Sequence, residues 1–421
     1  MLEMLSAARA RGPRLAEALP SALAAVRGTD SALFPACRRA AVLLIDGLGA
    51  DQLRRFSGYT RHLRAQAAGR MLGCFPSTTA VALTSLATGL DPLAHGVLEY
   101  QLYDEERRET QQMLSGWRRP ADTARWAVPE TVFEQAAAAG VPAVAIGPAK
   151  FAASGFTALS LRGAEYRPAA GVPGMVSALQ DFLAEPGPGI AYAYAPDVDH
   201  AGHAHGVGSP EHLHALDEVD QALGALRAPR GTSVLATADH GMLNPARHRL
   251  LQEADGFEDD VRLVVGEPRL TGLVLRRPER AEEVAARVAA ALGGAFEVVT
   301  TAALCDSGLL GEGPDRFRSR LGQVCVIGVD ADSAVYDERT ATPGSRAQVG
   351  PHGGGPTPAR PGPLGRGWRR APPRGGGGGV GGGAARGGGT RPPGPPRGAR
   401  AWGGQHGGAH PRELTVPLLR W

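Results

Sequence analysis

Three apolar segments of the sequence, each typical of a buried strand, end in acidic residues. The segments RAAVLLID, IAYAYAPDVD and TSVLATAD place Asp46, Asp199 and Asp239 at or just beyond the predicted strand ends. Continuous apolar runs are typical of strands in a parallel sheet that is covered on both faces. In such sheets ligands bind outside the carboxyl ends of the strands. We therefore expect these three acids, far apart in sequence, to meet at one edge of a sheet.

Segments with helical spacing alternate with the predicted strands. Helices are expected at 130–139, 173–184 and 211–226, and a further strand at 141–146. This alternation predicts an α/β fold with a mostly parallel sheet between two helical layers. The 421 residues, 43% of them hydrophobic, are enough for one large domain or two ordinary ones.

The composition changes abruptly near the C-terminus. Residues 350–408 hold 24 of the 59 Gly and 11 of the 34 Pro, a composition that cannot bury a core and is typical of disordered or loop-like sequence. The segment RELTVPLL after it again has the pattern of a strand. We therefore predict four parts: a helical lead-in (1–38), a main domain (39–340), a Gly/Pro/Arg-rich insert (350–408) and a returning C-terminal strand (409–421).

The charge of the chain is unevenly distributed. Residues 340–421 carry a net charge of +11, which leaves −8 for the rest of a chain with a net charge of +3. The basic segment lacks the interleaved aromatic residues of a stacking platform, so we predict no specific nucleic-acid partner. Four widely spaced Cys, the lack of an apolar h-region and the lack of an apolar run of about 18 residues predict a cytoplasmic protein with no membrane association. The sequence does not indicate the oligomeric state.

The predicted strand ends carry His as well as Asp. Asp199 and His203 are four residues apart in DVDHAGH, a spacing that puts both on one face of a helical turn. Asp239 and His240 are adjacent, and Asp46 stands alone. Asp and His are common ligands of Zn²⁺ and similar ions. Any one of these groups could be a helix cap or a loop residue, but three groups at three strand ends favour a metal site.

A hydroxyl-rich segment, FPSTT, precedes the apolar stretch 80–88. A hydroxyl at a helix N-terminus lies beside free backbone N–H groups that also bind anions such as phosphate. A metal ion can lower the pKa of such a hydroxyl and make it a nucleophile. The alternative is that Thr78 or Thr79 is an ordinary helix cap.

Taken together, five motifs resemble those of the type I phosphodiesterase/nucleotide pyrophosphatase family of the alkaline phosphatase superfamily. They are VLLIDGLG, FPSTTAVALTSLATGLDPLAHGV, YAPDVDHAGHAHG, ATADHGM and a late HGG. The resemblance covers about 40–337 and a piece at the C-terminus. It implies a three-layer α/β/α sandwich of the alkaline phosphatase type with a smaller cap or insert region, which we expect within 91–196 and 255–315.

The resemblance also implies a site. It implies Thr79 as the nucleophile, with Thr78 as the alternative one residue away. It implies two divalent metal ions, for which Zn²⁺ is favoured and Mn²⁺ is the alternative. The implied ligands are Asp46, Thr79, Asp239 and His240 for one ion, and Asp199, His203 and a late His for the other.

The late His has two candidates. His352 follows the family-like segment RFRSRLGQVCVIG without crossing the insert, which slightly favours it. His406 lies at short spacing before the returning strand, as in the family's C-terminal motif. The sequence leaves His352 and His406 as alternatives.

Two departures from the family bear on the substrate. The family's Phe-Pro-Asn-His after the nucleophile is replaced by AVAL, and Tyr100 stands near the position of a phosphoryl-binding Asn. The sulfatase branch of the superfamily has the motif Cys/Ser-x-Pro-x-Arg, and here Thr78 stands at the position of the Arg. A sulfatase is therefore not favoured. The predicted function is therefore a metal-dependent phosphodiesterase or nucleotide pyrophosphatase-like hydrolase of a small phosphate ester, with a nucleotide among the candidates. A phosphomonoesterase, a phosphonate hydrolase, a phosphomutase and a non-catalytic binding protein of the same fold are the alternatives.

Overall fold

The structure is a computed structural model that describes residues 12–117, 120–126, 128–339 and 403–421. Contacts divide the chain into one unit of residues 1–349 and 402–421 and a second unit of residues 350–401. All described residues belong to the first unit.

A seven-stranded sheet forms the centre of this unit, in the strand order β2-β15-β8-β1-β7-β5-β6. Strand β15 is antiparallel to both of its neighbours, and the ladder from β8 to β6 is parallel. The predicted strands and the mostly parallel sheet are thus confirmed. The strands are β1 (Arg39–Ile45), β2 (Ala67–Leu72), β5 (Ala143–Pro148), β6 (Glu165–Ala169), β7 (Gly189–Ala195), β8 (Thr232–Thr237) and β15 (Thr415–Arg420).

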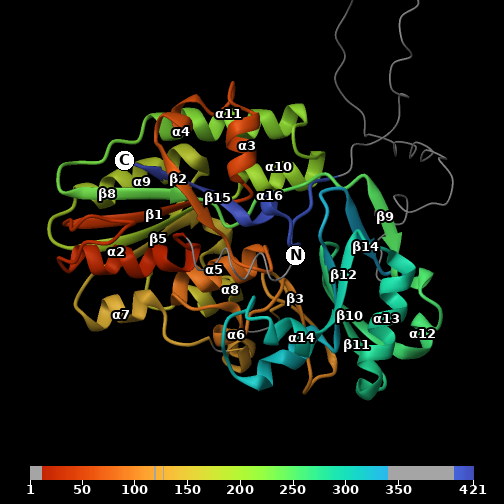
Figure 1. The fold of residues 1–421 in the computed structure, drawn as a ribbon. Coiled ribbons are helices and arrows are strands. Elements are labelled where there is room, and N and C mark those ends of the chain that lie inside the picture. The colour runs from red at the N-terminus through yellow and green to blue at the C-terminus, as the bar shows by residue number, and fades with distance from the viewer. Residues whose placement is uncertain (1–11, 118–119, 127, 340–402) are drawn as a thin grey trace, which may run out of the picture. The chain divides into compact units, whose positions relative to one another are not determined.

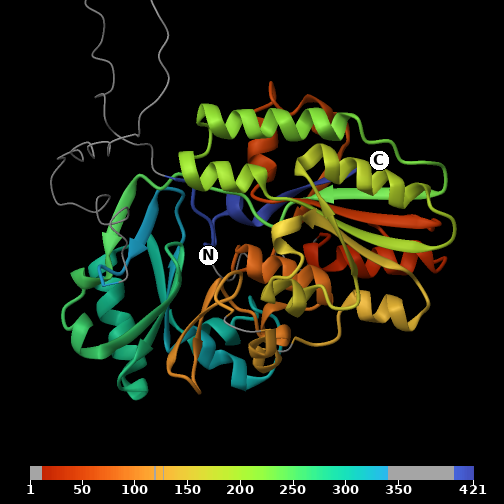
Figure 2. The same cartoon turned by 180° about the vertical axis from the view of Figure 1, so that it is seen from behind.

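Helices cover both faces of the sheet (Figures 1 and 2). One layer contains η1 (Leu15–Glu17), α2 (Ala18–Val26), α5 (Thr79–Thr88), α7 (Val132–Ala138) and α8 (Gly155–Ser160). The other contains α3 (Ala50–Arg55), α4 (Arg61–Ala65), α9 (Gly171–Ala184), α10 (Asp197–His205) and α11 (Pro210–Gly224). The fold is the three-layer sandwich that the sequence predicts.

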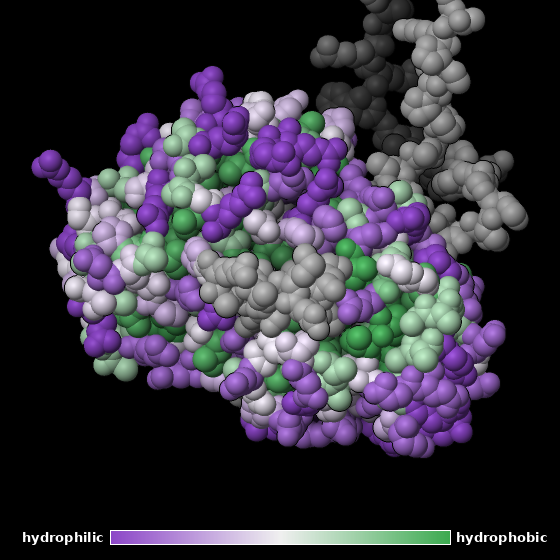
Figure 3. Space-filling view, in the orientation of Figure 1, coloured by the Kyte–Doolittle hydropathy of each residue, from purple (hydrophilic) through white to green (hydrophobic). Residues whose placement is uncertain are grey.

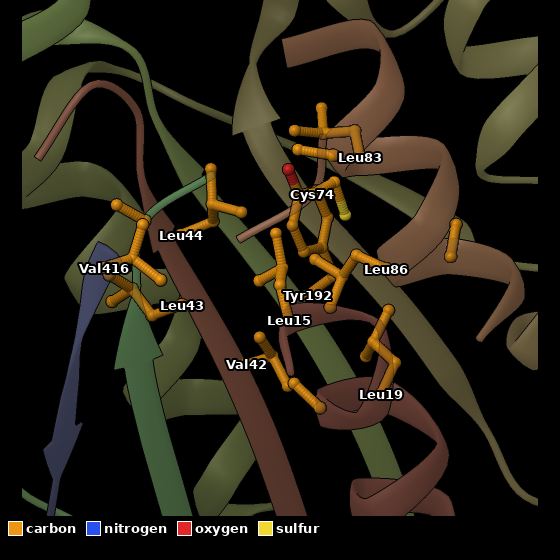
Figure 4. Close-up of a cluster of buried hydrophobic side chains, with 14 of the residues drawn as sticks. Leu15, Leu19, Val42, Leu43, Leu44, Cys74, Leu83, Leu86, Tyr192 and Val416 are labelled. Atoms are coloured by element: carbon orange, nitrogen blue, oxygen red, sulfur yellow. The ribbon is translucent and has the colours of Figure 1, made fainter. Parts of the chain in front are cut away.

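The main core lies between β1 and the layer of α2 and α5. Every residue of β1 is buried, because the strand has parallel neighbours on both sides and helices on both faces. Figure 4 shows Leu15 and Leu19 beside Val42, and Leu86 of α5 close by. This packing fixes the carboxyl end of β1, where Asp46 follows, relative to the first turn of α5.

A smaller antiparallel sheet, in the order β10-β11-β13-β12, has its own core against α13. Its elements are β10 (Val261–Glu267), β11 (Leu270–Leu275), α13 (Ala281–Leu292), β12 (Phe296–Thr300) and β13 (Val324–Gly328). This smaller sheet corresponds to the insert expected within 255–315, but it ends later, at Gly328. The insert expected within 91–196 is wrong in its second half, because β5, β6 and β7 pair in the main sheet. Their apolar runs are buried by α7 and α9, which makes them core strands.

The remaining elements are short and lie between the strands of the two sheets or in the links from one sheet to the other. They are α6 (Pro92–His95), β3 (Gln101–Asp104), β4 (Glu109–Gln112), η2 (Pro120–Trp126), η3 (Ala149–Phe151), β9 (Arg247–Leu250), η4 (Leu251–Glu253), α12 (Phe257–Asp260), η5 (Pro278–Arg280), α14 (Thr301–Asp306), η6 (Asp315–Leu321), β14 (Ser333–Tyr336) and α16 (Pro411–Leu414). In the face shown in Figure 3, hydrophilic side chains gather over α3, α4 and α11. Among the described helices, none combines the length and the hydropathy that crossing a bilayer requires.

Candidate metal centre

The carboxyl ends of two neighbouring strands bring together three buried ligand-type side chains. Asp46 follows β1, and Asp239 and His240 follow β8. The Nε2 atom of His240 lies 3.6 Å from Oδ1 of Asp46 and 3.3 Å from Oδ2 of Asp239. The other oxygen of Asp239 accepts the backbone N–H of Gly47, at 3.1 Å. We call Asp46, Asp239 and His240 the Asp46 cluster.

Thr79 is the first residue of α5, and its hydroxyl reaches the Asp46 cluster. Thr78 is the N-cap, in an extended conformation, and the first turn therefore directs Thr79 toward the strand ends. Oγ1 of Thr79 lies 3.1 Å from Nε2 of His240. Thr78 is also fully buried, but it faces Glu99. Burial raises the pKa of the Glu99 carboxyl, and the Thr78 hydroxyl offsets a part of this rise. Of the two threonines, Thr79 is the one next to the cluster.

A second cluster forms where α10 faces the C-terminal loop. Asp199 and His203 are one turn apart on α10, with Oδ1 of Asp199 3.4 Å from Nε2 of His203. Nε2 of His406 lies 3.0 Å from Nε2 of His203 and 3.9 Å from Oδ1 of Asp199. We call Asp199, His203 and His406 the Asp199 cluster. His352 lies outside the described residues.

The two clusters are neighbours. The rings of His240 and His406 stack with their centroids 3.8 Å apart and their planes at 25°. One ring belongs to each cluster, so a small substrate can contact both groups at once. Two-metal sites that act on phosphate esters use such adjacent ligand groups.

Hydrogen bonds set the orientation of His406. Its Nδ1 lies 3.0 Å from the carbonyl oxygen of Ser77. A carbonyl oxygen only accepts, so Nδ1 carries the proton and donates, and Nε2 keeps a lone pair directed at the cluster. The hydroxyl of Ser77 accepts the N–H of Gly407 and donates to the carbonyl of Gly408, both at 3.0 Å.

A buried ion pair holds the same loop from the other side. Oε1 of Glu413 accepts the N–H of Gly408 at 3.0 Å. The Glu413 carboxylate pairs with Arg269 at 2.8 Å, and neither side chain is exposed. The remaining Arg269 donors go to backbone carbonyls, including that of Gly328 in β13. The loop that carries His406 is thereby attached to both sheets.

Burial dominates the electrostatics of the clusters. Burial, and then the charges of Asp239 and Asp199, raise the pKa of Asp46 well above its usual value. Burial and the charge of Asp239 likewise raise the pKa of Asp199. Burial lowers the pKa of His203 to about 4 and that of His406 well below its usual value. The imidazoles are therefore neutral at pH 7, which is the form that binds metal.

The donor atoms fit divalent metal ions. Oδ1 of Asp46, Oδ2 of Asp239 and Oδ1 of Asp199 are buried and have no hydrogen-bond partner, and both clusters are candidate metal-binding groups by geometry. Ligand atoms around a tetrahedral Zn²⁺ lie about 3.4 Å from one another. The separations of 3.3, 3.4 and 3.6 Å within the clusters are close to that value. Nitrogen and carboxylate oxygen donors suit Zn²⁺ and Mn²⁺.

Sequence reasoning missed two residues that contact the clusters. The hydroxyl of Tyr194 donates to Asp46, and Oε2 of Glu267 lies 3.5 Å from Nδ1 of His406. Burial raises the pKa of Glu267 to about 8. The one signal for Tyr194 is its place near the end of the apolar run IAYAYA, beside the edge where the acids meet. Glu267, on the smaller sheet, has no local signal.

Two other residues singled out in the sequence lie away from the clusters. The hydroxyl of Tyr100 lies 3.4 Å from that of Ser115 on the exposed surface. His95 accepts the N–H of Val97 at Nδ1 and contacts the hydroxyl of Ser85 at Nε2. His95 therefore links the turn after α6 to α5.

Residues 40–354 match the sequence model of the type I phosphodiesterase/nucleotide pyrophosphatase family. The chain belongs to this family. It is accordingly a hydrolase that acts on phosphoric ester or pyrophosphate bonds, and the family is metal-dependent. The matched residues include Thr79 and both acidic clusters apart from His406, and they extend to His352. A search of curated proteins finds no match to the chain.

Solved structures share the fold. Murine ectonucleotide pyrophosphatase/phosphodiesterase 5 superposes with a TM-score of 0.59 at 14% identity, over 90% of this chain and 87% of that one. An inactive threonine-to-alanine variant of the murine protein is known in complex with AMP. Phosphonoacetate hydrolase from Sinorhizobium meliloti 1021, in complex with phosphonoformate, gives a TM-score of 0.61 at 17% identity, over 92% of this chain and 91% of that one.

Proposed function

We propose that the protein hydrolyses phosphodiesters, with Thr79 as the nucleophile and two divalent metal ions, most simply Zn²⁺, in the two clusters. The observation that carries the proposal is the position of the Thr79 hydroxyl, 3.1 Å from Nε2 of His240 and at the N-terminus of α5. Bound metal ions would lower the pKa of the hydroxyl and offset negative charge on the phosphoryl oxygens.

The chain's own residues account for the remaining requirements. Asp46, Asp239 and His240 would hold one ion beside Thr79, and Asp199, His203 and His406 would hold the other. We favour His406 over His352 as the third ligand because Ser77 holds its ring with Nε2 facing Asp199 and His203. The hydrogen bond from Tyr194 fixes one oxygen of Asp46 and leaves the other for the metal.

The reaction has two balanced steps. In the first, Oγ1 of Thr79 forms a bond to phosphorus, the bond from phosphorus to the leaving oxygen breaks, and the threonine proton is lost to solvent while the leaving alcohol takes one up. In the second, water forms a bond to phosphorus and loses a proton, the bond from phosphorus to Oγ1 of Thr79 breaks, Oγ1 takes up a proton, and a phosphomonoester is released. Splitting one difficult step into two easier ones is the advantage of covalent catalysis.

The charge of the site favours a diester over a monoester. In the described part of the chain, Asp46, Asp199 and Asp239 form ion pairs only with His, and no Arg or Lys side chain joins the clusters. Arg is the usual partner of a terminal phosphate with two charges. A diester carries a single charge and needs no such partner.

A substrate panel tests the proposal. Metal-loaded protein should release 4-nitrophenol from bis(4-nitrophenyl) phosphate at a higher kcat/KM than from 4-nitrophenyl phosphate, and Thr79→Ala should do neither. Phosphate release from phosphonoacetate tests the second candidate, phosphonate hydrolysis, which the fold of the Sinorhizobium enzyme brings into consideration. Hydrolysis of the monoester alone, or of phosphonoacetate alone, would refute the diesterase proposal.

A further inference from the structure

A small apolar cavity of about 80 Å³ opens beside Thr79, on the α5 side of the main sheet. Its walls come from α5, α8, β5, β6 and β7, and none of its lining residues carries a charge. They include Leu83, Phe156, Tyr166 and Tyr192. The cavity is therefore in contact with the proposed nucleophile but differs in character from the two charged clusters.

Tyrosine hydroxyls in the wall of this cavity have different partners. The hydroxyl of Tyr166 donates to the carbonyl of Pro148 at 2.9 Å, and that of Tyr194 donates to Asp46. The hydroxyl of Tyr192 is buried and has no hydrogen-bond partner. In Figure 4 the Tyr192 hydroxyl points toward Leu83. Leu83 also lines the cavity. A buried hydroxyl without a partner is destabilising, so a ligand that supplies one gains affinity.

The position of the cavity identifies the part of the substrate that it can hold. In an in-line displacement the leaving group departs on the side of phosphorus opposite the attacking oxygen. A group that lies beside Thr79 is therefore one that stays attached to phosphorus. A diester has such a group as well as a leaving alcohol, whereas a phosphomonoester has only the leaving alcohol.

We propose that this cavity binds the ester group that stays on phosphorus, and that this group is short, uncharged and carries one hydrogen-bonding atom for the hydroxyl of Tyr192. The inference rests on the proposed diesterase function and specifies its substrate class. A closed cavity of about 150 Å³ holds benzene in another protein, so a space of about 80 Å³ suits a short chain better than an aromatic ring or a nucleoside.

A neighbouring cavity has charged residues in its wall and could bind a charged ester group instead. It has a volume of about 220 Å³ and shares Tyr194 with the first, but Thr79 does not line it. Lys150 and Asp197 are among its lining residues. An ester with a charged group would be directed there, whereas the uncharged cavity excludes a charge because burying it without a partner is costly.

The experiment compares 4-nitrophenyl phosphodiesters that differ only in the second ester group. The groups are 2-methoxyethyl and butyl, which have equal length and differ by one acceptor oxygen, together with 3-carboxypropyl and thymidine 5′. We expect kcat/KM for the methoxyethyl ester to exceed that for the butyl ester about five-fold, the effect of one hydrogen bond, and the other two to be at least about ten-fold slower. A preference for the carboxylate or the thymidine ester would overturn the inference.

Two matched variants locate the effect. Tyr192→Phe should reduce the ratio of methoxyethyl to butyl ester to about one, whereas Tyr166→Phe should keep the ratio, since the Tyr166 hydroxyl already has a partner. The melting temperature gives an independent readout. Tyr192→Phe should melt at the same temperature as the wild type or higher, and Tyr166→Phe should melt lower because it leaves the Pro148 carbonyl unpaired. An unchanged ratio in Tyr192→Phe would refute the assignment of this hydroxyl.

Failure of this inference can be told apart from failure of the proposed function. Calorimetry measures binding of the monoesters 2-methoxyethyl phosphate and butyl phosphate to metal-loaded protein, without turnover. If no diester is hydrolysed but the methoxyethyl compound binds more tightly, and Tyr192→Phe removes the difference, the cavity assignment holds and the function is wrong. If all diesters react at equal rates and both monoesters bind equally, the function holds and the cavity assignment is wrong.

Discussion

Nδ1 of His406 donates a hydrogen bond to the carbonyl oxygen of Ser77 over 3.0 Å, although the two residues are 329 positions apart in the chain. Ser77 lies two residues before Thr79, so the backbone that begins α5 also orients a ligand of the Asp199 cluster. The nucleophile and the second cluster are thus fixed by one short segment. The Ser77 hydroxyl also holds the His406 loop, through Gly407 and Gly408, so its removal should affect metal binding without altering any ligand.

Replacement of Ser77 by Ala tests this coupling. The hydroxyl makes two hydrogen bonds to the His406 loop, and loss of such supporting bonds typically weakens metal binding about 10–100-fold. We expect titration of the Ser77→Ala protein to show one weakened site and one unchanged site. Ser85→Ala, which removes another buried hydroxyl that bonds His95, is the control and should retain both affinities. Equal affinities in Ser77→Ala and wild type would show that the loop is held by other contacts.

Replacement of Thr79 by Ala should abolish turnover and leave the metal content unchanged. Loss of a nucleophile typically costs at least about 1,000-fold in rate, whereas the Asp46 cluster keeps its two carboxylates and His240. Thr78→Ala is the matched control and should be much milder, because its hydroxyl faces Glu99. The turnover rate and the metal content, measured by elemental analysis, of both variants show which threonine is the nucleophile. A slow Thr78→Ala with a near-normal Thr79→Ala would reverse the assignment.

The strands and the edge where the acids meet were predictable from the sequence because the signal is local. Continuous apolar runs of buried parallel strands stand out from alternating ones, and Asp46 and Asp239 directly follow two of them. The family resemblance added the roles of Thr79 and the His residues. A single sheet with a common edge was enough to bring Asp46 and Asp239 together.

The remaining features depend on contacts that leave no pattern in the sequence. Glu267 comes from the smaller sheet and approaches His406 only through tertiary packing. The ion pair of Arg269 with Glu413 is likewise long-range, and its effect on the His406 loop cannot be inferred from either segment alone. The insert expected within 91–196 is too long because its bounds came from the family resemblance, whereas the apolar run IAYAYA already placed β7 in the main sheet.

His406 and His352 are distinguished by metal content. We expect His406→Ala to bind about one fewer metal ion per chain and to lose nearly all activity, because it removes one of three ligands and leaves Asp199 and His203. His352→Ala should match the wild type. His410→Ala serves as a second control from the same loop, since Nδ1 of His410 accepts the N–H of Arg412 instead of facing the cluster. Loss of metal in His352→Ala would support the alternative ligand, and silence of both variants would contradict the two-metal site.

Removal of metal should destabilise the fold as well as abolish activity. Burial, and then the nearby charge of Asp239, raise the pKa values of Asp46 and Asp199, so a cation at either cluster relieves an unfavourable charge. An ion that binds the folded state at a hundred times its Kd stabilises it by about 2.7 kcal/mol per site, which for a chain of 421 residues corresponds to a rise in melting temperature of about 3–4 °C per site. Calorimetric scans with chelator, with Zn²⁺ and with Mn²⁺ measure this. Asp199→Asn should show a smaller rise, and an equal rise would contradict the ligand role of Asp199.

His95 should make the protein less stable at acidic pH. Its Nδ1 accepts the N–H of Val97, so the proton resides on Nε2 beside Ser85. Burial, followed by the positive charge of Arg320, lowers the pKa of His95 to about 3, whereas an unfolded His titrates near about 6.5. Between these values the unfolded state binds the additional proton, so the free energy of unfolding falls as the pH falls, by up to about 1.4 kcal/mol per pH unit.

The variant His95→Gln removes this dependence. At pH 7.5 it should be less stable than the wild type, because it loses the fitted contacts of the imidazole with Ser85 and Val97. The difference should shrink by about 2–3 kcal/mol between pH 6.5 and 4.5, since only the wild type has a histidine at this position that the unfolded state can protonate. Urea unfolding at several pH values, with chelator present throughout so that metal release does not contribute, measures both curves. Parallel curves would mean that His95 becomes protonated in the folded protein without cost, which its burial and the proximity of Arg320 argue against.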